Sequence, residues 1–176
     1  PNIVVVQLES FFDVNRLKDI EFSENPLPNL TQLSKRCASG FLSVPVIGAG
    51  TVNSEFEMLT GMNIDDFGIG EYPYKTVLKE KTCESLAYNL KSYGYKAYAI
   101  HDHEGSFYER NLVYPNLGFD VFDSVEYMWP EGYTAMEWSK DSVLTGEIEK
   151  ALSATAEKDF VFAVAVQSHG SYPSEP

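Results

Sequence analysis

The chain has 176 residues, of which 44% are hydrophobic and 14% aromatic, enough apolar material for the core of one ordinary domain. Its 13 lysines and arginines against 26 aspartates and glutamates give a formal net charge of −13. A surface of that sign repels nucleic acid, and no basic stretch with interleaved aromatic residues offsets it. We therefore expect no nucleic-acid partner. The longest apolar run is too short to span a bilayer, and no signal-peptide pattern opens the chain.

Two features concern the chain as a whole. Cys37 and Cys83 do not stand at the spacing of metal ligands, and they fit either a disulfide or two buried thiols. The sequence begins on an apparent strand and stops at Tyr-Pro-Ser-Glu-Pro. We therefore expect it to be part of a longer protein.

The first predicted element covers residues 2–8, a β-branched run without alternation. Such a run is typical of a strand that is covered on both faces in a parallel sheet. Glu9 follows at the carboxyl end, where open α/β sheets bind ligands. Glu9 is therefore a candidate metal ligand or acid/base, and a helix-capping or loop carboxylate is the equal alternative.

A polar connection over residues 11–28 separates this strand from the next elements. Asn29 is placed to cap a helix that runs to about Ala38. Residues 41–47 then predict a second strand that leads into a glycine-rich turn.

Residues 46–61 read as strand, glycine turn and helix. Gly48 and Gly50 allow a tight turn, and Thr51 stands at the mouth of the helix. The unpaired N–H groups and the positive dipole at a helix start favour a phosphate or an alkoxide nearby. Thr51 is thus a candidate nucleophile, and the commoner alternative is a residue that only caps the helix.

The remaining elements continue the alternation of helices and strands. Residues 63–81 have no period and predict a loop long enough to suggest a function. The other predicted elements are a helix capped by Thr82 and ended by Gly94, a strand over 96–100, a helix over 106–114, a strand over 119–122, an aromatic loop over 127–138, a helix capped by Ser139, and a strand over 160–166. The order predicts an α/β fold, with a mostly parallel sheet sandwiched by helices.

All three histidines follow predicted strands, as Glu9 does. His101 and His103 come after the strand over 96–100, and His169 after the last strand. Carboxyl ends of parallel strands meet at one sheet edge, so these side chains and Thr51 are expected together. Arg110 adds a planar set of donors for a phosphate.

These residue types are the parts of a metal-assisted phosphoryl or sulfuryl transfer site. A threonine hydroxyl is a poor nucleophile at neutral pH unless a base or a divalent cation lowers its pKa. Glu9 could hold that cation, and the histidines could donate to phosphate oxygens or protonate a leaving group. The alternatives are ordinary loop histidines, a solvated Arg110, and Trp129 and Trp138 as packing residues.

Several segments together resemble a known family. They are Pro1 to Ser10, Gly50 to Phe56, His101, Phe107 to Arg110, and Gly118 to Asp123. The set is similar to the extracellular catalytic domain of lipoteichoic acid synthases, in the alkaline phosphatase/sulfatase superfamily. The resemblance runs through most of the chain.

The resemblance implies a membrane-anchored enzyme at the extracellular face of the cell membrane. It implies transfer of glycerol phosphate from phosphatidylglycerol to a glycerol-phosphate polymer, through a phospho-threonine intermediate. The implied cofactor is a divalent ion, Mn²⁺ first, with Mg²⁺ and Zn²⁺ as alternatives. Glu9 would be a metal ligand, and Thr51 both ligand and nucleophile. His101, Arg110 and His169 would contact the glycerol-phosphate group.

The sequence departs from the family pattern at two of the implied substrate positions. Tyr108 stands where the family often has tryptophan, and His103 where it often has aspartate. The family's remaining metal ligands, an aspartate and a histidine, would follow Pro176. On this basis residues 1–176 are expected to be the N-terminal part of a single sulfatase-like catalytic domain.

Other functions remain as alternatives. A phosphoethanolamine transferase also uses threonine, and a hydrolase of the sulfatase/phosphodiesterase type is a further alternative. An arylsulfatase would resemble a Cys/Ser-x-Pro-x-Arg pattern, which neither cysteine segment fits. A non-catalytic surface module that binds glycerol phosphate would need the histidines and Arg110 but not Thr51.

Overall fold

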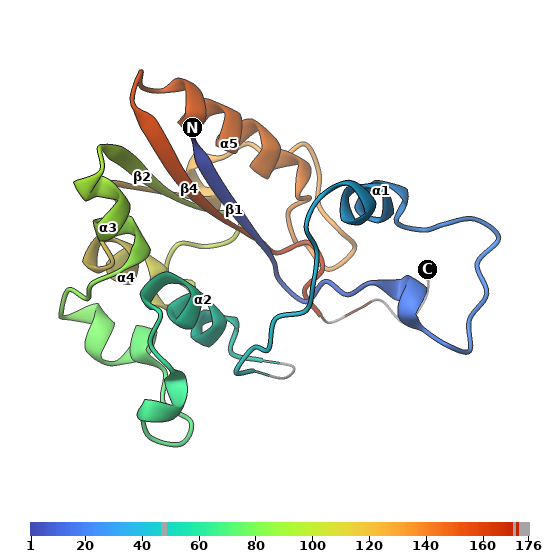
Figure 1. Ribbon diagram of the computed structural model, residues 1–176, viewed down its shortest axis with the longest axis horizontal. Coiled ribbons are helices and arrows are strands. Elements are labelled where there is room, and N and C mark those ends of the chain that lie inside the picture. The colour runs from blue at the N-terminus through green and yellow to red at the C-terminus, as the bar shows by residue number, and fades with distance from the viewer. Residues whose placement is uncertain (47–48, 171, 173–176) are drawn as a thin grey trace. The chain divides into compact units, whose positions relative to one another are not determined.

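The computed structural model describes residues 1–46, 49–170 and 172, and it contains a four-stranded parallel sheet (Figure 1). The strands stand in the order β1-β4-β2-β3. Their bounds are β1 Ile3–Leu8, β2 Tyr95–His101, β3 Val121–Ser124 and β4 Lys158–Ala165. The predicted α/β class with a parallel sheet is confirmed.

The chain divides into two units, residues 1–10 with 45–176, and residues 11–44. The first unit holds the sheet and its helices, α2 (Thr51–Thr60), α3 (Leu86–Ser92), α4 (Arg110–Asn116) and α5 (Ser142–Ser153). The second holds α1 (Pro28–Arg36). That the whole chain is part of one catalytic domain stays a prediction.

Alternate residues of the central strands point to opposite sides of the sheet, so both faces carry apolar side chains. Helices bury these side chains on each face. On one face, Ala97 and Ala99 of β2 and Phe162 of β4 belong to the core cluster that includes α2, α3 and α4. On the other face, Ile100 and Val161 pack in the cluster that includes α5. Figure 1 shows α5 on one side of the sheet and the other three helices on the opposite side. The apolar run of β4 is therefore buried throughout.

Strand β1 differs from its prediction. It is an edge strand, and Val4, Val6 and Leu8 are 42%, 46% and 45% exposed while the residues between them are partly buried. The described helices of the first unit cover one face of β1, so the expectation of a strand covered on both faces is wrong here. A β-branched run does not by itself separate a central strand from an edge strand.

The strand predicted over residues 41–47 is also absent from the described part of this segment, residues 41–46; Ile47 lies outside the described residues. Phe41 and Leu42 are more than 80% exposed, so nothing buries their apolar surface. Helix α1 begins at Pro28 after Leu27, so Asn29 is not its cap. Proline at the first helical position suits this start, because it has no N–H to satisfy.

Two further helix caps were predicted at the wrong hydroxyl. Ser85 caps α3 by accepting from the Tyr88 N–H, so Thr82 does not. Asp141 precedes α5, and the Ser139 hydroxyl instead donates to the Asp102 carbonyl. Hydroxyl residues close together compete for a cap, and tertiary contacts decide which one is used.

Short 3-10 turns fill the connections. They are Val14–Arg16, Ile64–Asp66, Pro73–Lys75, Val77–Lys79, Phe107–Glu109 and Val125–Tyr127. Cys37 and Cys83 are both free thiols, and Cys37 is exposed. Among the described residues, no helix combines the length and apolar character needed to cross a bilayer.

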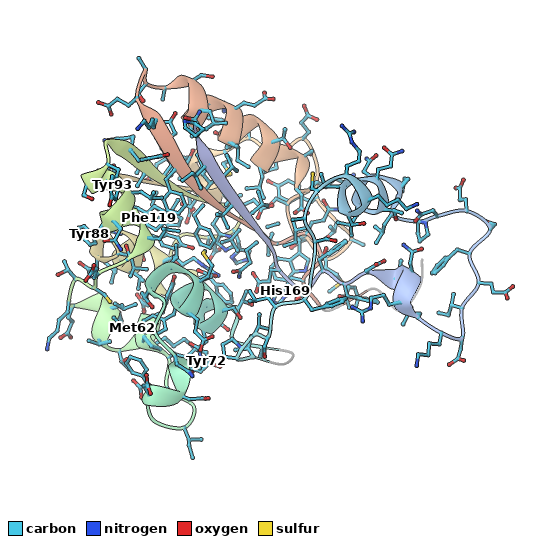
Figure 2. All side chains as sticks on the ribbon, viewed as in Figure 1. Met62, Tyr72, Tyr88, Tyr93, Phe119 and His169 are labelled. Atoms are coloured by element: carbon cyan, nitrogen blue, oxygen red, sulfur yellow. The ribbon has the colours of Figure 1, made fainter. Side chains whose placement is uncertain are left out.

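Gly118 offers a test of the packing around α3 and α4. It has φ +88°, and a Cβ there would stand 2.7 Å from the ring of Tyr88, which is labelled in Figure 2. We expect Gly118→Ala to lower the free energy of unfolding by about 1–3 kcal/mol, measured by denaturant titration. Gly146→Ala is the control, because an added Cβ meets nothing within 4 Å in α5. That variant should gain about 0.5–1 kcal/mol, and equal losses in both variants would contradict this account.

Candidate active site at the carboxyl edge of the sheet

The central contact of the site joins Thr51 to Glu9. The Thr51 hydroxyl donates to Glu9 Oε1 at 2.6 Å, although 42 residues separate them in sequence. Glu9 directly follows β1 and is 5% exposed, and Thr51 is the first residue of α2. The predicted proximity of the two oxygens is confirmed. Gly50, not Thr51, occupies the cap position, and α2 has no side-chain cap, so the capping alternative for Thr51 is wrong.

Gly50 makes the tight approach possible. Its φ is +84°, and a Cβ there would meet the Tyr72 hydroxyl at 2.9 Å. The predicted helix start after a glycine turn is confirmed, while Gly48 lies outside the described residues. Substituting Gly50 would therefore press on Tyr72 as well as strain the backbone.

The loop over residues 63–81 supplies the aromatic neighbours of this turn. Tyr72 stacks on Tyr108 with ring centroids 6.1 Å apart (Tyr72 is labelled in Figure 2). Lys75 Nζ lies 5.2 Å and 4.8 Å from the centroids of the two rings. Burial first, and then the neighbouring Tyr72, raise the pKa of Tyr108. The two tyrosines thus flank the start of α2, as an implied substrate contact at Tyr108 would require.

Arg110 is fully buried and bound to a residue that sequence reasoning did not single out. Its Nη2 donates to Glu55 Oε1 at 2.6 Å and its Nε to Glu55 Oε2 at 3.3 Å. Both side chains are 0% exposed. Glu55 stands four residues after Thr51, on the same side of α2, and that spacing was the available signal. Arg110 is therefore not the solvated charge that the sequence left as an alternative.

His101 lies next to Arg110 and is held between two partners. Arg110 Nη1 stands 3.1 Å from His101 Nε2, and His101 Nδ1 stands 3.0 Å from the Val164 carbonyl oxygen. A guanidinium can only donate and a carbonyl can only accept, so these partners assign the proton of His101 to Nδ1. Burial first, and then the charge of Arg110, lower the pKa of His101 well below its ordinary value. His101 is therefore neutral.

The ring of Trp138 lies near the rings of both other histidines, His103 and His169. The centroid distances are 5.2 Å from Trp138 to His103 and 4.9 Å to His169. His169 Nε2 stands 3.9 Å from Glu9 Oε1, which brings this group to the Thr51 contact. His103 Nδ1 and Trp138 Nε1 are buried without a hydrogen-bond partner among the described residues. Such unpaired groups at a sheet edge are suited to a polar ligand.

The structure thus brings the predicted residues into two connected groups. Glu9, Thr51 and His169 form one, and His101 and Arg110 form the other; His103 lies between them, with its ring centroid 5.9 Å from that of His101. Tyr108 borders the second group, with its ring centroid 5.6 Å from Arg110 Cζ. The roles of these residues in catalysis and binding stay predictions.

The donor set partly fits a divalent cation. A buried carboxylate and a hydroxyl at 2.6 Å are hard oxygen ligands of the kind that Mn²⁺ and Mg²⁺ prefer. In residues 1–46, 49–170 and 172, no group of three or more His, Cys, Asp or Glu side chains is arranged to hold a metal ion. Glu9 and Thr51 would therefore supply part of a coordination shell.

Comparison with known proteins identifies the family. The sequence matches the Sulfatase family over residues 1–176. The chain belongs to the sulfatase family. Solved structures with the same fold include a lipoteichoic acid synthase, so the fold that the resemblance implied is confirmed.

Two solved structures and one curated relative show the range of similar proteins. The lipoteichoic acid synthase LtaP from Listeria monocytogenes has a TM-score of 0.74 and 24% identity, covering 96% of this chain and 41% of that one. The Streptococcus pyogenes phosphoglycerol transferase GacH, in complex with sn-glycerol-1-phosphate, has a TM-score of 0.77 and 23% identity, covering 99% and 46%. A putative cyclic beta-1,2-glucan modification protein of Rhizobium meliloti (strain 1021) is 34% identical over 98% of this chain. The chain spans 26% of that relative's length.

Asp102 gives the site a testable dependence on pH. Its carboxylate is 1% exposed, and neither oxygen has a hydrogen-bond partner among the described residues. Burial first, and then the nearby Asp141 carboxylate, raise the pKa of Asp102 from 3.8 to about 7. The folded state therefore favours the protonated acid. Its contribution to stability is complete below pH 3.8 and is lost as the pH rises to about 7.

We expect Asp102→Asn to remove this loss, because the amide does not ionise. At pH 8 the variant should exceed the wild type in unfolding free energy by on the order of 2–4 kcal/mol, at about 1.4 kcal/mol per pKa unit. Urea titrations from pH 4 to pH 8 measure the effect. Asp120→Asn is the control with the opposite sign, because the hydrogen bond from the Ala97 N–H and then the nearby Lys91 lower the pKa of Asp120. Parallel pH curves for the wild type and Asp102→Asn would refute the assignment.

Proposed function

We propose that this chain carries the nucleophile of a metal-dependent phosphoglycerol transferase. The observation that carries the proposal is the 2.6 Å hydrogen bond from the Thr51 hydroxyl to the buried Glu9 carboxylate at the start of α2. Helix N-termini favour anions, and a carboxylate acceptor prepares the hydroxyl for attack. GacH, which shares the fold, is a phosphoglycerol transferase that was solved with sn-glycerol-1-phosphate.

The proposed reaction has two steps. Thr51 Oγ attacks the phosphorus of phosphatidylglycerol, and the bond from phosphorus to the diacylglycerol oxygen breaks. Glu9 lies in position to accept the hydroxyl proton, and the diacylglycerol leaves as an alcohol after it takes up a proton. An acceptor hydroxyl then attacks the phospho-threonine, which releases Thr51 and completes the transfer of glycerol phosphate.

A divalent cation held by Glu9 and Thr51, Mn²⁺ first and Mg²⁺ or Zn²⁺ as alternatives, would lower the pKa of the hydroxyl and offset the phosphate charge. His169, 3.9 Å from Glu9, borders the space where the phosphate would bind. His103 Nδ1 and Trp138 Nε1, which lack partners among the described residues, are suited to its oxygens or to the glycerol hydroxyls.

The acceptor that we propose is a glucan hydroxyl. The curated relative at 34% identity is named as a glucan modification protein, and the aromatic stack of Tyr72 and Tyr108 beside Thr51 suits a sugar ring. A glycerol-phosphate polymer of the lipoteichoic acid type is the alternative acceptor. We place the reaction at the outer face of a membrane, which the protein would reach through segments outside this chain.

Competing functions fit the site less well. A module that only binds glycerol phosphate would need the histidines and Arg110 but not Thr51, so it would leave the hydrogen bond between Thr51 and Glu9 without a function. A formylglycine sulfatase would need a Cys/Ser-x-Pro-x-Arg pattern, which is absent from the sequence. A phosphoethanolamine transferase shares the threonine nucleophile and differs in the head group.

Replacement of Thr51 in the full-length protein tests the nucleophile. Thr51→Ala removes the atom that carries the intermediate, so transfer from radiolabelled phosphatidylglycerol should fall at least a hundredfold, the lower end of the about 10²–10⁴-fold range for loss of a catalytic group. Thr51→Ser keeps the hydroxyl and should retain measurable transfer. Mass spectrometry of quenched wild-type reactions should show glycerol phosphate on the Thr51 peptide. Wild-type turnover in Thr51→Ala would end the proposal.

Metal removal and acceptor exchange test the rest of the reaction. Chelation should abolish transfer by the full-length protein, and Mn²⁺ should restore it. Residues 1–176 alone should show no transfer, since Glu9 and Thr51 provide too few ligands for a stable site. With metal restored, β-linked glucan should gain label faster than polyglycerol phosphate. The reverse preference would replace the glucan with the polymer as acceptor, and label on neither would point to a different head group.

A further inference from the structure

The buried cluster around Arg110 extends beyond the residues that would touch a substrate. Glu55 is 0% exposed and binds three donors, two from Arg110 and the Tyr114 hydroxyl at 2.9 Å from Oε2. All three donors come from side chains that are themselves fully buried, and Arg110 lies between Glu55 and His101. Any effect that it has on the reaction must pass through another residue.

Two contacts, both made by Arg110, connect Glu55 to His101. Glu55 takes Nε and Nη2 of Arg110, which fixes the plane of the guanidinium. In that plane Nη1 reaches His101 Nε2 at 3.1 Å and the Phe107 carbonyl oxygen at 3.3 Å. The Glu55 carboxylate binds the opposite edge of the Arg110 guanidinium and therefore fixes the direction in which Nη1 points toward His101.

We infer that Glu55 is a positioning residue for the proposed transfer reaction. It orients Arg110, and through Arg110 it holds His101 as the neutral form with its proton on Nδ1. The expected effect on the transfer rate rests on the proposed function. The expected effect on His101 rests only on the described contacts. In this arrangement His101 Nε2 already accepts a hydrogen bond, so His101 does not supply the proton to the leaving group.

Glu55 also links this cluster to the nucleophile. Thr51 and Glu55 stand one helical turn apart on α2, so the start of the helix and the ion pair belong to one rigid element. Tyr108 and Glu109, which precede Arg110, have φ of +57° and +60°. Left-handed backbone is unfavourable for such residues and persists where surrounding contacts hold it. The ion pair is one contact that anchors this segment against α2.

The experiment uses four variants of the full-length protein, Glu55→Gln, Arg110→Gln, the double variant, and Tyr114→Phe. Each is measured for melting temperature and for kcat/KM of glycerol-phosphate transfer. Glu55→Gln leaves Arg110 as an unpaired buried charge, so it should lower the melting temperature, and transfer should fall at least tenfold at temperatures where the variant is folded. The double variant leaves no unpaired charge, so its melting temperature should rise again.

Transfer should not recover in the double variant, and its kcat/KM should equal that of Arg110→Gln alone, because Glu55 acts through Arg110. Tyr114→Phe is the matched control, since it removes another hydrogen bond from Glu55 but leaves the Arg110 contacts in place. It should lower the melting temperature and keep kcat/KM within about twofold, since it spares the guanidinium. Transfer that follows the melting temperature across all four variants would overturn the inference. So would losses that multiply in the double variant.

A second measurement separates this inference from the proposed function. If the wild type does not transfer glycerol phosphate, the function fails, and the ring nitrogens of His101 still report the contact. In ¹⁵N-labelled full-length protein, His101 should be neutral with its proton on Nδ1. Glu55→Gln and Arg110→Gln should both shift the Nε2 resonance, and Tyr114→Phe should leave it in place. An unchanged Nε2 resonance in Glu55→Gln would overturn the inference.

Discussion

The buried ion pair between Glu55 and Arg110 is the contact on which the site depends most. It joins α2 to α4, and the Arg110 contact with His101 joins both helices to the end of β2. Two charges removed from water are costly, and the cost is offset where geometry is good and the remaining donors and acceptors are used. Here Tyr114 and the Phe107 carbonyl meet that condition. Removing either partner would leave the other as a buried charge without its oppositely charged neighbour.

The parallel sheet converts distant sequence positions into neighbours. Glu9 follows edge strand β1, His101 ends β2, and His169 comes after β4. All strands run the same way, so their carboxyl ends share one edge, as in other open α/β folds. Thr51 reaches this edge because Gly50 adopts a left-handed conformation before α2. Thr51 and Glu9 therefore meet across 42 residues of sequence.

Electrostatics explain why the site needs its buried and unpaired donors. The chain carries a formal net charge of −13, and the phospholipid phosphate of the proposed reaction is an anion. The charge of Arg110 is matched by Glu55, so in the proposed reaction the phosphate would be attracted by the start of α2, by a cation held by Glu9 and Thr51, and by hydrogen-bond donors. Lys75 lies over the rings of Tyr72 and Tyr108 and adds a positive charge on the same side of the turn. Glucan and polymer acceptors would both approach this partly aromatic surface.

The sequence by itself determined the fold class, most strands and helices, and the edge where Glu9, Thr51 and the histidines gather. Those features depend on local periodicity, on glycine conformation and on the shared direction of parallel strands, all of which can be read along the chain. Only the tertiary structure decided that β1 is an edge strand, that residues 41–46 form no strand, and that Ser85 caps α3. Each of these outcomes depends on which partner a segment meets. Glu55 is the clearest case, because a glutamate on an amphipathic helix predicts a solvated charge until Arg110, 55 residues later, buries against it.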